Sequence, residues 1–172
     1  DGSPDIYVCT DNASPDRIWI NNGNGTFNAL PPSGIRHTSR SSMGMDAADI
    51  NRDGIDDFFV VDMFARSHEK RMTQLAKQHS SSDIIQHIYG QPRYNRNALF
   101  VGREDGTFSE TALMAGVAAT DWSWCPVFLD VDLDGYEDLL VTNGFSFDVM
   151  DQDSQDQLRT MQLSKFDRKR SR

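Results

Sequence analysis

The 172-residue sequence has little cysteine and no long apolar stretch. Its two cysteines, Cys9 and Cys125, allow at most one disulfide and do not identify the redox compartment. No apolar run approaches the ~18 residues that a membrane-spanning helix needs, so we expect no membrane span. Apolar residues make up 38% and charged residues 25% of the chain, which is ordinary for a globular protein.

The common catalytic motifs are missing as well. The sequence has no Gly-x-Ser-x-Gly nucleophile elbow and no glycine-rich phosphate loop, and neither cysteine lies in an activating motif. Three histidines, His68, His79 and His87, lie near one another, but their spacing matches no transition-metal motif, and His37 stands apart. We therefore expect structural or surface histidines and no enzymatic activity.

Basic residues are few outside the C-terminus. The chain carries 17 Lys and Arg against 26 Asp and Glu, for a net charge of −9. The last eight residues, 165–172, hold five of the bases and one acid, which leaves 12 bases against 25 acids elsewhere. Such a surface repels phosphates, so we expect no nucleic-acid partner.

Two acidic segments match each other almost position by position. Residues 49–57 (loop 1) read Asp-Ile-Asn-Arg-Asp-Gly-Ile-Asp-Asp, and residues 130–138 (loop 2) read Asp-Val-Asp-Leu-Asp-Gly-Tyr-Glu-Asp. An apolar, β-prone run follows each loop at once, at 58–61 and 139–142. The N-terminus, residues 1–5, repeats the second half of the same pattern. We infer that the chain is built on an internal repeat.

A second signature is duplicated in the same register. Residues 22–27 and 103–108 each follow an apolar stretch and contain Asn-Gly or Asp-Gly, dipeptides that favour tight β-hairpins. From the glycine of that dipeptide to the first aspartate of the next acidic loop is 24 residues in both copies. Because unrelated acidic loops would not keep this register, the repeat includes both signatures.

Short strands separated by Gly, Asn and Asp turns predict an all-β fold. A repeated unit of several short strands is typical of a β-propeller blade, which buries its faces against neighbouring blades. We expect residues 1–148 to form about three partial blades, and residues 149–172 a helical or disordered extension. Three partial blades do not close a ring of the usual size, so we expect either that the chain is a fragment of a longer propeller or that other segments complete the ring.

The second repeat carries an insertion, roughly residues 63–93, whose pattern is helical. Apolar residues recur at helical spacing over 67–79, with Ser67 as the N-cap. A second short helix is predicted over 83–89, and a further amphipathic helix over 151–166. We expect the insertion to pack on the propeller, with a partner-binding surface as the alternative.

Both acidic loops have the composition of a Ca²⁺ site. Side-chain oxygens fall at positions 1, 3, 5 and 9 and glycine at position 6, where a sharp turn is needed. Ca²⁺ prefers 6–8 oxygen ligands, and the carboxylates would repel one another without a cation. The predicted ligands are Asp49, Asn51, Asp53, the Ile55 carbonyl and Asp57 in loop 1, and Asp130, Asp132, Asp134, the Tyr136 carbonyl and Asp138 in loop 2. A weaker half-site at the N-terminus retains Asp1, the Ser3 carbonyl and Asp5.

An EF-hand shares part of this pattern but does not fit. It needs a bidentate Glu at position 12 and flanking helices, whereas position 12 is Val60 in loop 1 and Val141 in loop 2, inside β-prone runs. Two alternatives stay open. The loops could be metal-free Asp/Gly turns, or they could take Mg²⁺, which fits less well because it keeps several waters.

These loops and the strands after them resemble FG-GAP/VCBS repeats, the calcium-binding β-propeller repeats also found in integrin α-chain heads. The resemblance covers roughly residues 1–62 and 94–148. Residues 42–46, and the segment from 116 to 144 around loop 2, are similar to the bacterial branch that is often linked to an ASPIC/UnbV domain. The resemblance implies a seven-bladed propeller in the parent protein, with calcium loops between strands of a blade.

The resemblance also implies a periplasmic, cell-surface or extracellular setting and a role in adhesion or ligand binding. The expected partner is a protein or glycan, and calcium would act structurally. The alternative is an accessory or catalytic part of a secreted polysaccharide-active enzyme, for which the histidine-bearing insertion and Trp122 and Trp124 are the candidates. We expect the two tryptophans to be core or interface residues rather than a sugar-stacking platform.

Overall fold

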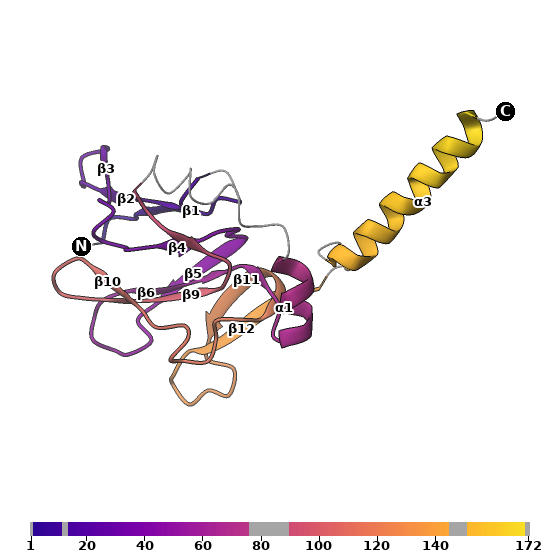
Figure 1. Cartoon of the computed structure of the whole chain (residues 1–172). Coiled ribbons are helices and arrows are strands. Elements are labelled where there is room, and N and C mark those ends of the chain that lie inside the picture. The colour runs from indigo at the N-terminus through magenta and orange to yellow at the C-terminus, as the bar shows by residue number, and fades with distance from the viewer. Residues whose placement is uncertain (1, 12–13, 76–89, 145–150, 171–172) are drawn as a thin grey trace.

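The computed structural model describes residues 2–11, 14–75, 90–144 and 151–170 (Figure 1). These residues form short strands, one short helix beside the sheets and one helix at the C-terminus. The strands are β1 (Ile6–Val8), β2 (Arg17–Asn21), β3 (Phe27–Ala29), β4 (Thr38–Ser39), β5 (Gly44–Ala48), β6 (Asp57–Val61), β7 (Met63–Phe64), β8 (Arg93–Tyr94), β9 (Ala98–Gly102), β10 (Phe108–Glu110), β11 (Asp121–Leu129) and β12 (Asp138–Asn143). The helices are α1 (His68–Leu75) and α3 (Gln152–Arg170).

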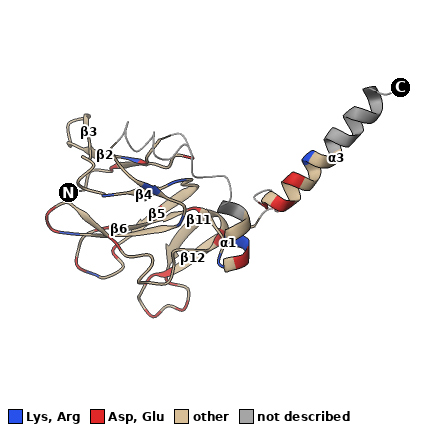
Figure 2. Cartoon of the chain, in the orientation of Figure 1, with Lys and Arg blue, Asp and Glu red and all other residues tan. Residues whose placement is uncertain are grey.

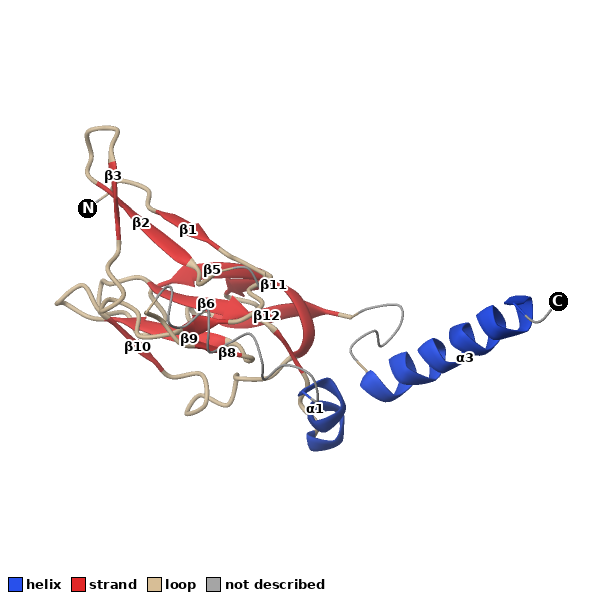
Figure 3. Cartoon of the chain, turned by 45° about the horizontal axis from the view of Figure 1, so that its top comes forward, coloured by secondary structure: helices blue, strands red, loops and turns tan. Residues whose placement is uncertain are grey.

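The strands pair mainly with their neighbours along the chain. A central sheet of four antiparallel strands has the order β10-β9-β6-β5. A first sheet contains β1-β2-β3, and a third sheet has the order β12-β11-β7. The predicted mostly-β architecture is therefore seen, and among the described residues no sheet closes on itself (Figure 3).

The sequence repeat is also a repeat of strands. Loop 1 joins β5 to β6, and loop 2 joins β11 to β12. The Asn-Gly and Asp-Gly signatures lie in the hairpins β2–β3 and β9–β10, as their dipeptides predict. Each acidic loop therefore directly precedes the equivalent strand, β6 after loop 1 and β12 after loop 2. In the first and central sheets, the hairpin supplies the last two strands.

The core lies on both faces of the central sheet, because successive side chains of a strand point to opposite faces. Phe58 belongs to one buried cluster, in which its ring stacks on Phe100 with the centroids 4.7 Å apart. Phe59, the next residue of β6, belongs to the other cluster together with Leu99. All five residues of β6 are buried, so this strand is packed on both faces.

Two buried aspartates each accept several hydrogen bonds. Asp16 accepts hydrogen bonds from the Tyr7 hydroxyl (2.7 Å) and the Thr10 amide (2.8 Å). Asp62 accepts hydrogen bonds from the Ser39 hydroxyl and from the Met63 amide, the second at 2.6 Å. Burial raises the pKa of both carboxyl groups, and these hydrogen bonds oppose the rise.

The insertion differs from its prediction at both ends. Residues 63–64 form β7, which pairs with β11, and residues 93–94 form β8, which pairs in parallel with β4. The first end adds β7 to the edge of the third sheet, and the second end forms a separate two-stranded sheet with β4. Helix α1 falls within the predicted 67–79 segment, and the Ser67 hydroxyl accepts a hydrogen bond from the Lys70 amide at 3.2 Å, as an N-cap does. The rest of that segment and the helix predicted over 83–89 lie outside the described residues.

The C-terminal helix is longer than its prediction over 151–166. Asp151 caps α3 by accepting a hydrogen bond from the Ser154 amide at 3.0 Å, and the helix runs to Arg170. It projects away from the sheets (Figure 1), and its apolar residues Leu158 and Met161 are exposed. Among the described residues, no helix has the length and apolar character needed to cross a membrane.

Candidate metal centre

Loop 1 is curled by hydrogen bonds between its own side chains and backbone. The Asp49 carboxylate accepts from the amides of Asp53 (3.0 Å) and Gly54 (2.8 Å). The Asn51 side chain accepts from the Asp53 amide, and the Asp53 carboxylate accepts from the Ile55 amide, both at 2.9 Å. These short-range bonds turn the oxygens of positions 1, 3 and 5 toward the inside of the loop.

Loop 2 has the same local structure. The Asp130 carboxylate accepts from the amides of Asp134 (3.0 Å) and Gly135 (2.8 Å), and Asp134 accepts from the Tyr136 amide (2.8 Å). Position 6 is left-handed in both loops, with φ of 85° at Gly54 and 86° at Gly135. Glycine adopts this conformation without strain, which explains its place in the pattern.

Position 9 connects each loop to the neighbouring structure. The Asp57 carboxylate accepts from the amides of Gly102 (2.8 Å) and Ile50 (3.2 Å) and is fully buried. Burial raises the pKa of Asp57, and these two hydrogen bonds oppose that rise. Asp138, its counterpart in loop 2, is exposed and accepts from the Val131 amide at 3.1 Å.

The carboxylates of loop 2 converge. One oxygen each of Asp130, Asp132 and Asp138 lies within 4.8 Å of the others. Two oxygens that each lie 2.3–2.6 Å from the same Ca²⁺ are at most about 5 Å apart, so this spacing and this all-oxygen donor set fit a hard cation. It is the one such group of acidic, His or Cys side chains within the described part of the chain. Figure 2 shows the acidic residues along this loop.

Loop 1 does not reach the same convergence. Position 3 is the amide Asn51, which donates a hydrogen bond to the Asp53 carboxylate at 2.9 Å. The three predicted carboxylate ligands of loop 1 (Asp49, Asp53 and Asp57) form no group of the kind seen in loop 2. Of the predicted half-site, Asp1 lies outside the described residues, and the Asp5 carboxylate accepts from the Asn21 amide at 2.8 Å. The structure therefore brings together three of the predicted loop 2 ligands and leaves the other predicted ligands untested.

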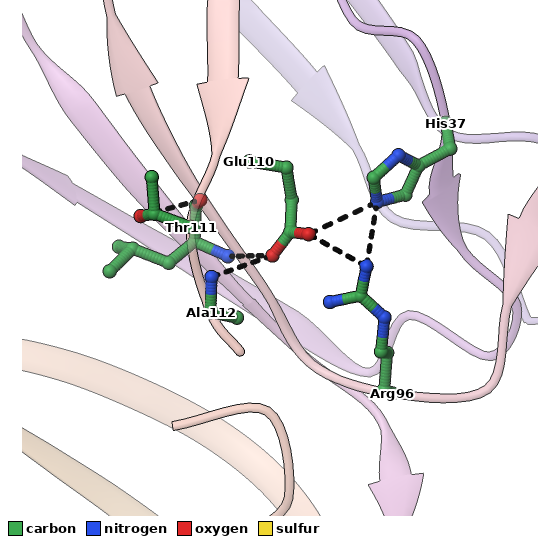
Figure 4. A network of polar contacts seen from close by, with 6 residues as sticks. His37, Arg96, Glu110, Thr111 and Ala112 are labelled. Carbon is green, nitrogen blue, oxygen red and sulfur yellow. Dashed lines mark hydrogen bonds and ion pairs between the residues drawn. The ribbon is translucent and has the colours of Figure 1, made fainter. Parts of the chain in front are cut away.

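A half-buried ionic network, which the sequence did not indicate, joins β10 to the segments before β4 and β9 (Figure 4). Glu110 Oε2 accepts a hydrogen bond from Arg96 at 2.7 Å and lies 3.5 Å from His37 Nε2, while Oε1 accepts from the Ala112 amide at 2.7 Å. Burial by itself raises the pKa of Glu110, but the hydrogen bonds from His37, Arg96 and Ala112 outweigh it and lower the pKa to about 2. Glu110 is therefore ionised at neutral pH and unsuited to act as a general acid.

A cavity of about 510 Å³ lies beside this network, with His37, Arg36, Arg103 and Glu110 among its lining residues. His37 could not be assigned to it from the sequence because no motif surrounds that residue. The only sequence feature that bears on Glu110 is the second hairpin signature, residues 103–108, which ends two residues before it.

The two cysteines and two of the tryptophans are further side chains that the sequence analysis singled out. Cys9 and Cys125 are free thiols, and burial, together with the charge of Asp16, raises the pKa of Cys9 to about 12. The Trp122 and Trp124 rings lie 6.3 Å apart, and the Trp124 indole donates to the Gly144 carbonyl at 2.8 Å. Trp124 is 40% exposed, so it lies outside the core of the described structure, and its place at a blade interface stays a prediction.

Comparison with known families agrees with this repeat architecture. A family model described as FG-GAP-like repeat matches residues 1–60 and 83–141, which is more than half of the chain. The chain belongs to the FG-GAP-like repeat family. The matched ranges include both FG-GAP-like acidic loops and both hairpin signatures. FG-GAP repeats are associated with β-propeller, integrin-like binding domains. Searches of curated proteins and of solved structures give no match.

Proposed function

We propose that this chain is a calcium-stabilised segment of a β-propeller that serves extracellular binding or adhesion and is not itself catalytic. The observation that carries the proposal is the convergence of Asp130, Asp132 and Asp138 in a loop that leads directly into β12. Membership in the FG-GAP-like repeat family supports the same assignment.

The strand order supports the propeller. The central sheet has the four antiparallel strands of a propeller blade, in chain order from β5 to β10. Strands β1, β2 and β3 of the first sheet correspond to β6, β9 and β10 of the central sheet. Strands β11 and β12 correspond to β5 and β6. Strands β5 and β11 also approach closely, since a Cβ on Gly44 would lie 2.7 Å from the Trp124 carbonyl oxygen. We infer that the chain supplies one whole blade and two partial blades. Three points remain predictions from the resemblance: the seven-bladed ring, the VCBS class and the ASPIC/UnbV-linked branch.

The residues of loop 2 can hold a cation without losing their internal hydrogen bonds. Each carboxylate oxygen has two lone pairs, so Asp130 can accept from the Asp134 and Gly135 amides and still face an ion. Bound Ca²⁺ supplies the charge that neutralises the clustered carboxylates. Binding to the folded form alone stabilises it by about 2.7 kcal/mol at a Ca²⁺ concentration a hundred times Kd.

The surface chemistry favours a ligand other than nucleic acid. Twenty-six acids outnumber 17 bases, and the acids concentrate in the loops at the strand ends (Figure 2). We infer a protein or glycan ligand and a periplasmic, cell-surface or extracellular location, where millimolar Ca²⁺ is available to weak sites. The pKa of about 2 at Glu110 supports a structural role for the half-buried ionic network around it.

Thermal unfolding with and without a chelator tests the proposal. Removing Ca²⁺ should lower Tm by several degrees, because about 1 kcal/mol corresponds to roughly 2–4 °C in a domain of this size. Asp132→Ala should abolish most of this shift, since it removes one of the three converging carboxylates. Asp156→Ala, which removes an exposed acid from α3, should leave the shift intact. A wild-type Tm that is the same in excess chelator and in millimolar Ca²⁺ would contradict the proposal.

A further inference from the structure

The two acidic loops touch each other through one side chain. Arg52, at position 4 of loop 1, places its guanidinium carbon 3.9 Å from the centre of the Tyr136 ring of loop 2. A Cβ added to Gly135 would lie 3.5 Å from Arg52 Nη2, so the guanidinium also lies beside the backbone of loop 2. This contact joins two loops that are far apart in the sequence.

The position of Arg52 depends on the structure of loop 1. Its backbone is left-handed, with φ of 60°, and the next residue, Asp53, donates its amide to the Asp49 carboxylate. This left-handed backbone is sterically unfavourable for arginine, so the hydrogen bonds within loop 1 must stabilise the turn. Repulsion between the carboxylates of loop 1 opposes this turn, and a turn that opened would carry the guanidinium away from Tyr136.

Tyr136 in turn lies among the predicted ligands of loop 2. Its amide donates to the Asp134 carboxylate at 2.8 Å, and its carbonyl is the predicted ligand of position 7. A guanidinium stacked on its ring restricts this part of the loop before an ion arrives. A loop that is already ordered loses less conformational entropy on binding.

The contact is not a product of the repeat. Loop 2 has Leu133 at position 4, and loop 1 has Ile55 at position 7, so neither loop could make this contact with a second copy of itself. Leu133 adopts φ of 62°, which shows that leucine is accepted at position 4 of this turn. The chain therefore offers a matched replacement for Arg52.

We propose that Arg52 couples the two loops, so that an ion bound in loop 1 raises the affinity of loop 2. This inference rests on the proposed function and adds the requirement that loop 1 also binds Ca²⁺, through the oxygens of Asp49, Asn51 and Asp53 that its turn directs inward. Coupling of binding free energies is reciprocal, so an ion in loop 2 raises the affinity of loop 1 by the same factor. An exposed cation–π contact corresponds to roughly a two- to five-fold change in affinity.

Terbium titrations of the whole chain test the coupling. Tb³⁺ takes the same oxygen ligands as Ca²⁺, and the part of its tyrosine-excited luminescence that Asp132→Ala removes reports on loop 2. Asp53→Ala, which disables loop 1, should raise the loop 2 Kd roughly two- to five-fold. Arg52→Leu should raise it by a similar factor, and the double variant Arg52→Leu/Asp53→Ala should show no further increase.

Arg103→Leu is the matched control. Arg103 lines a cavity with Asp53, so its loss removes the same charge beside loop 1 without removing the contact with Tyr136. The effect of Asp53→Ala on loop 2 should persist in this variant. Calorimetry with Ca²⁺ repeats the measurement with the ion of the proposed function.

The two hypotheses fail in different ways. If Asp53→Ala changes the loop 2 Kd by the same factor with and without Arg52, or does not change it at all, the coupling is wrong and calcium binding stands. If the wild-type chain binds neither Ca²⁺ nor Tb³⁺, the proposed function itself is wrong. Far-UV circular dichroism of each variant checks that the sheets are intact.

Discussion

Strands β6 and β12 occupy equivalent places after their acidic loops, yet their side chains are buried to different extents. Phe59 and Leu140 follow the last aspartate of loop 1 and loop 2 at the same distance, but Phe59 is 0% and Leu140 is 52% exposed. Strand β6 lies between β5 and β9, whereas β12 ends the order of its sheet. Burial is thus determined by the neighbouring strands, even where the local sequence is repeated.

The same contrast holds at position 9 of the loops. Asp57 is enclosed because the hairpin β9–β10 packs on loop 1, and a Cβ on Gly102 would lie 2.5 Å from the Ile55 side chain. Asp138 is exposed in loop 2. In loop 1, the hairpin β9–β10 therefore both covers the position 9 aspartate and donates a hydrogen bond to it from Gly102.

Truncation of the two equivalent apolar residues should show the largest difference. We expect Phe59→Ala to lower the free energy of unfolding by about 3–5 kcal/mol, since it empties a fully buried site. Leu140→Ala should lower it by less than about 1 kcal/mol, because half of the side chain is already in water. Urea denaturation at pH 7 measures both; similar losses would contradict the comparison.

Truncation of the position 9 aspartates should give a smaller difference. Asp57→Ala leaves the amides of Gly102 and Ile50 without their acceptor, at a cost of about 1–3 kcal/mol. In Ca²⁺-free buffer, Asp138→Ala should cost about 0.5 kcal/mol or less because its surroundings are hydrated. The measurement is chemical denaturation in excess chelator, and an equal cost at both positions would show that the hairpin does not matter.

The smallest of the three main losses of stability is expected from truncation of Glu110. The first sheet lacks the Glu110 network because Ala29 stands at the position equivalent to Glu110. The folded-state pKa of Glu110, about 2, lies below its ordinary value of 4.5, so the network stabilises the fold above pH 4.5 and the stabilisation is lost as the pH falls toward 2. We expect Glu110→Ala to cost about 1–2 kcal/mol at pH 7.

The difference between wild type and Glu110→Ala should shrink when the urea denaturation is repeated at pH 3. A gap in stability that stays constant between pH 7 and pH 3 would show that the carboxylate charge is not what stabilises the network. Glu104→Ala, which removes an exposed acid from the turn of the same hairpin, serves as the control for general charge effects.

Much of the loop structure could be predicted because its contacts are local. The Asp49 and Asp130 carboxylates bind amides four and five residues ahead, and glycine at position 6 permits the turn. The hairpins were predictable for the same reason, since their turn dipeptides favour one geometry. The ends of the insertion were not, because β7 and β8 pair with strands distant in the sequence.

The amino-acid sequence alone determined the repeat, the short strands and the two oxygen-rich loops, because each depends on residues within one turn or one strand. Only the tertiary structure decided which position 9 aspartate is buried, that His37 and Arg96 meet Glu110, and that Arg52 lies on Tyr136. These contacts join segments far apart in the chain, and no local pattern specifies which distant surface a side chain will meet.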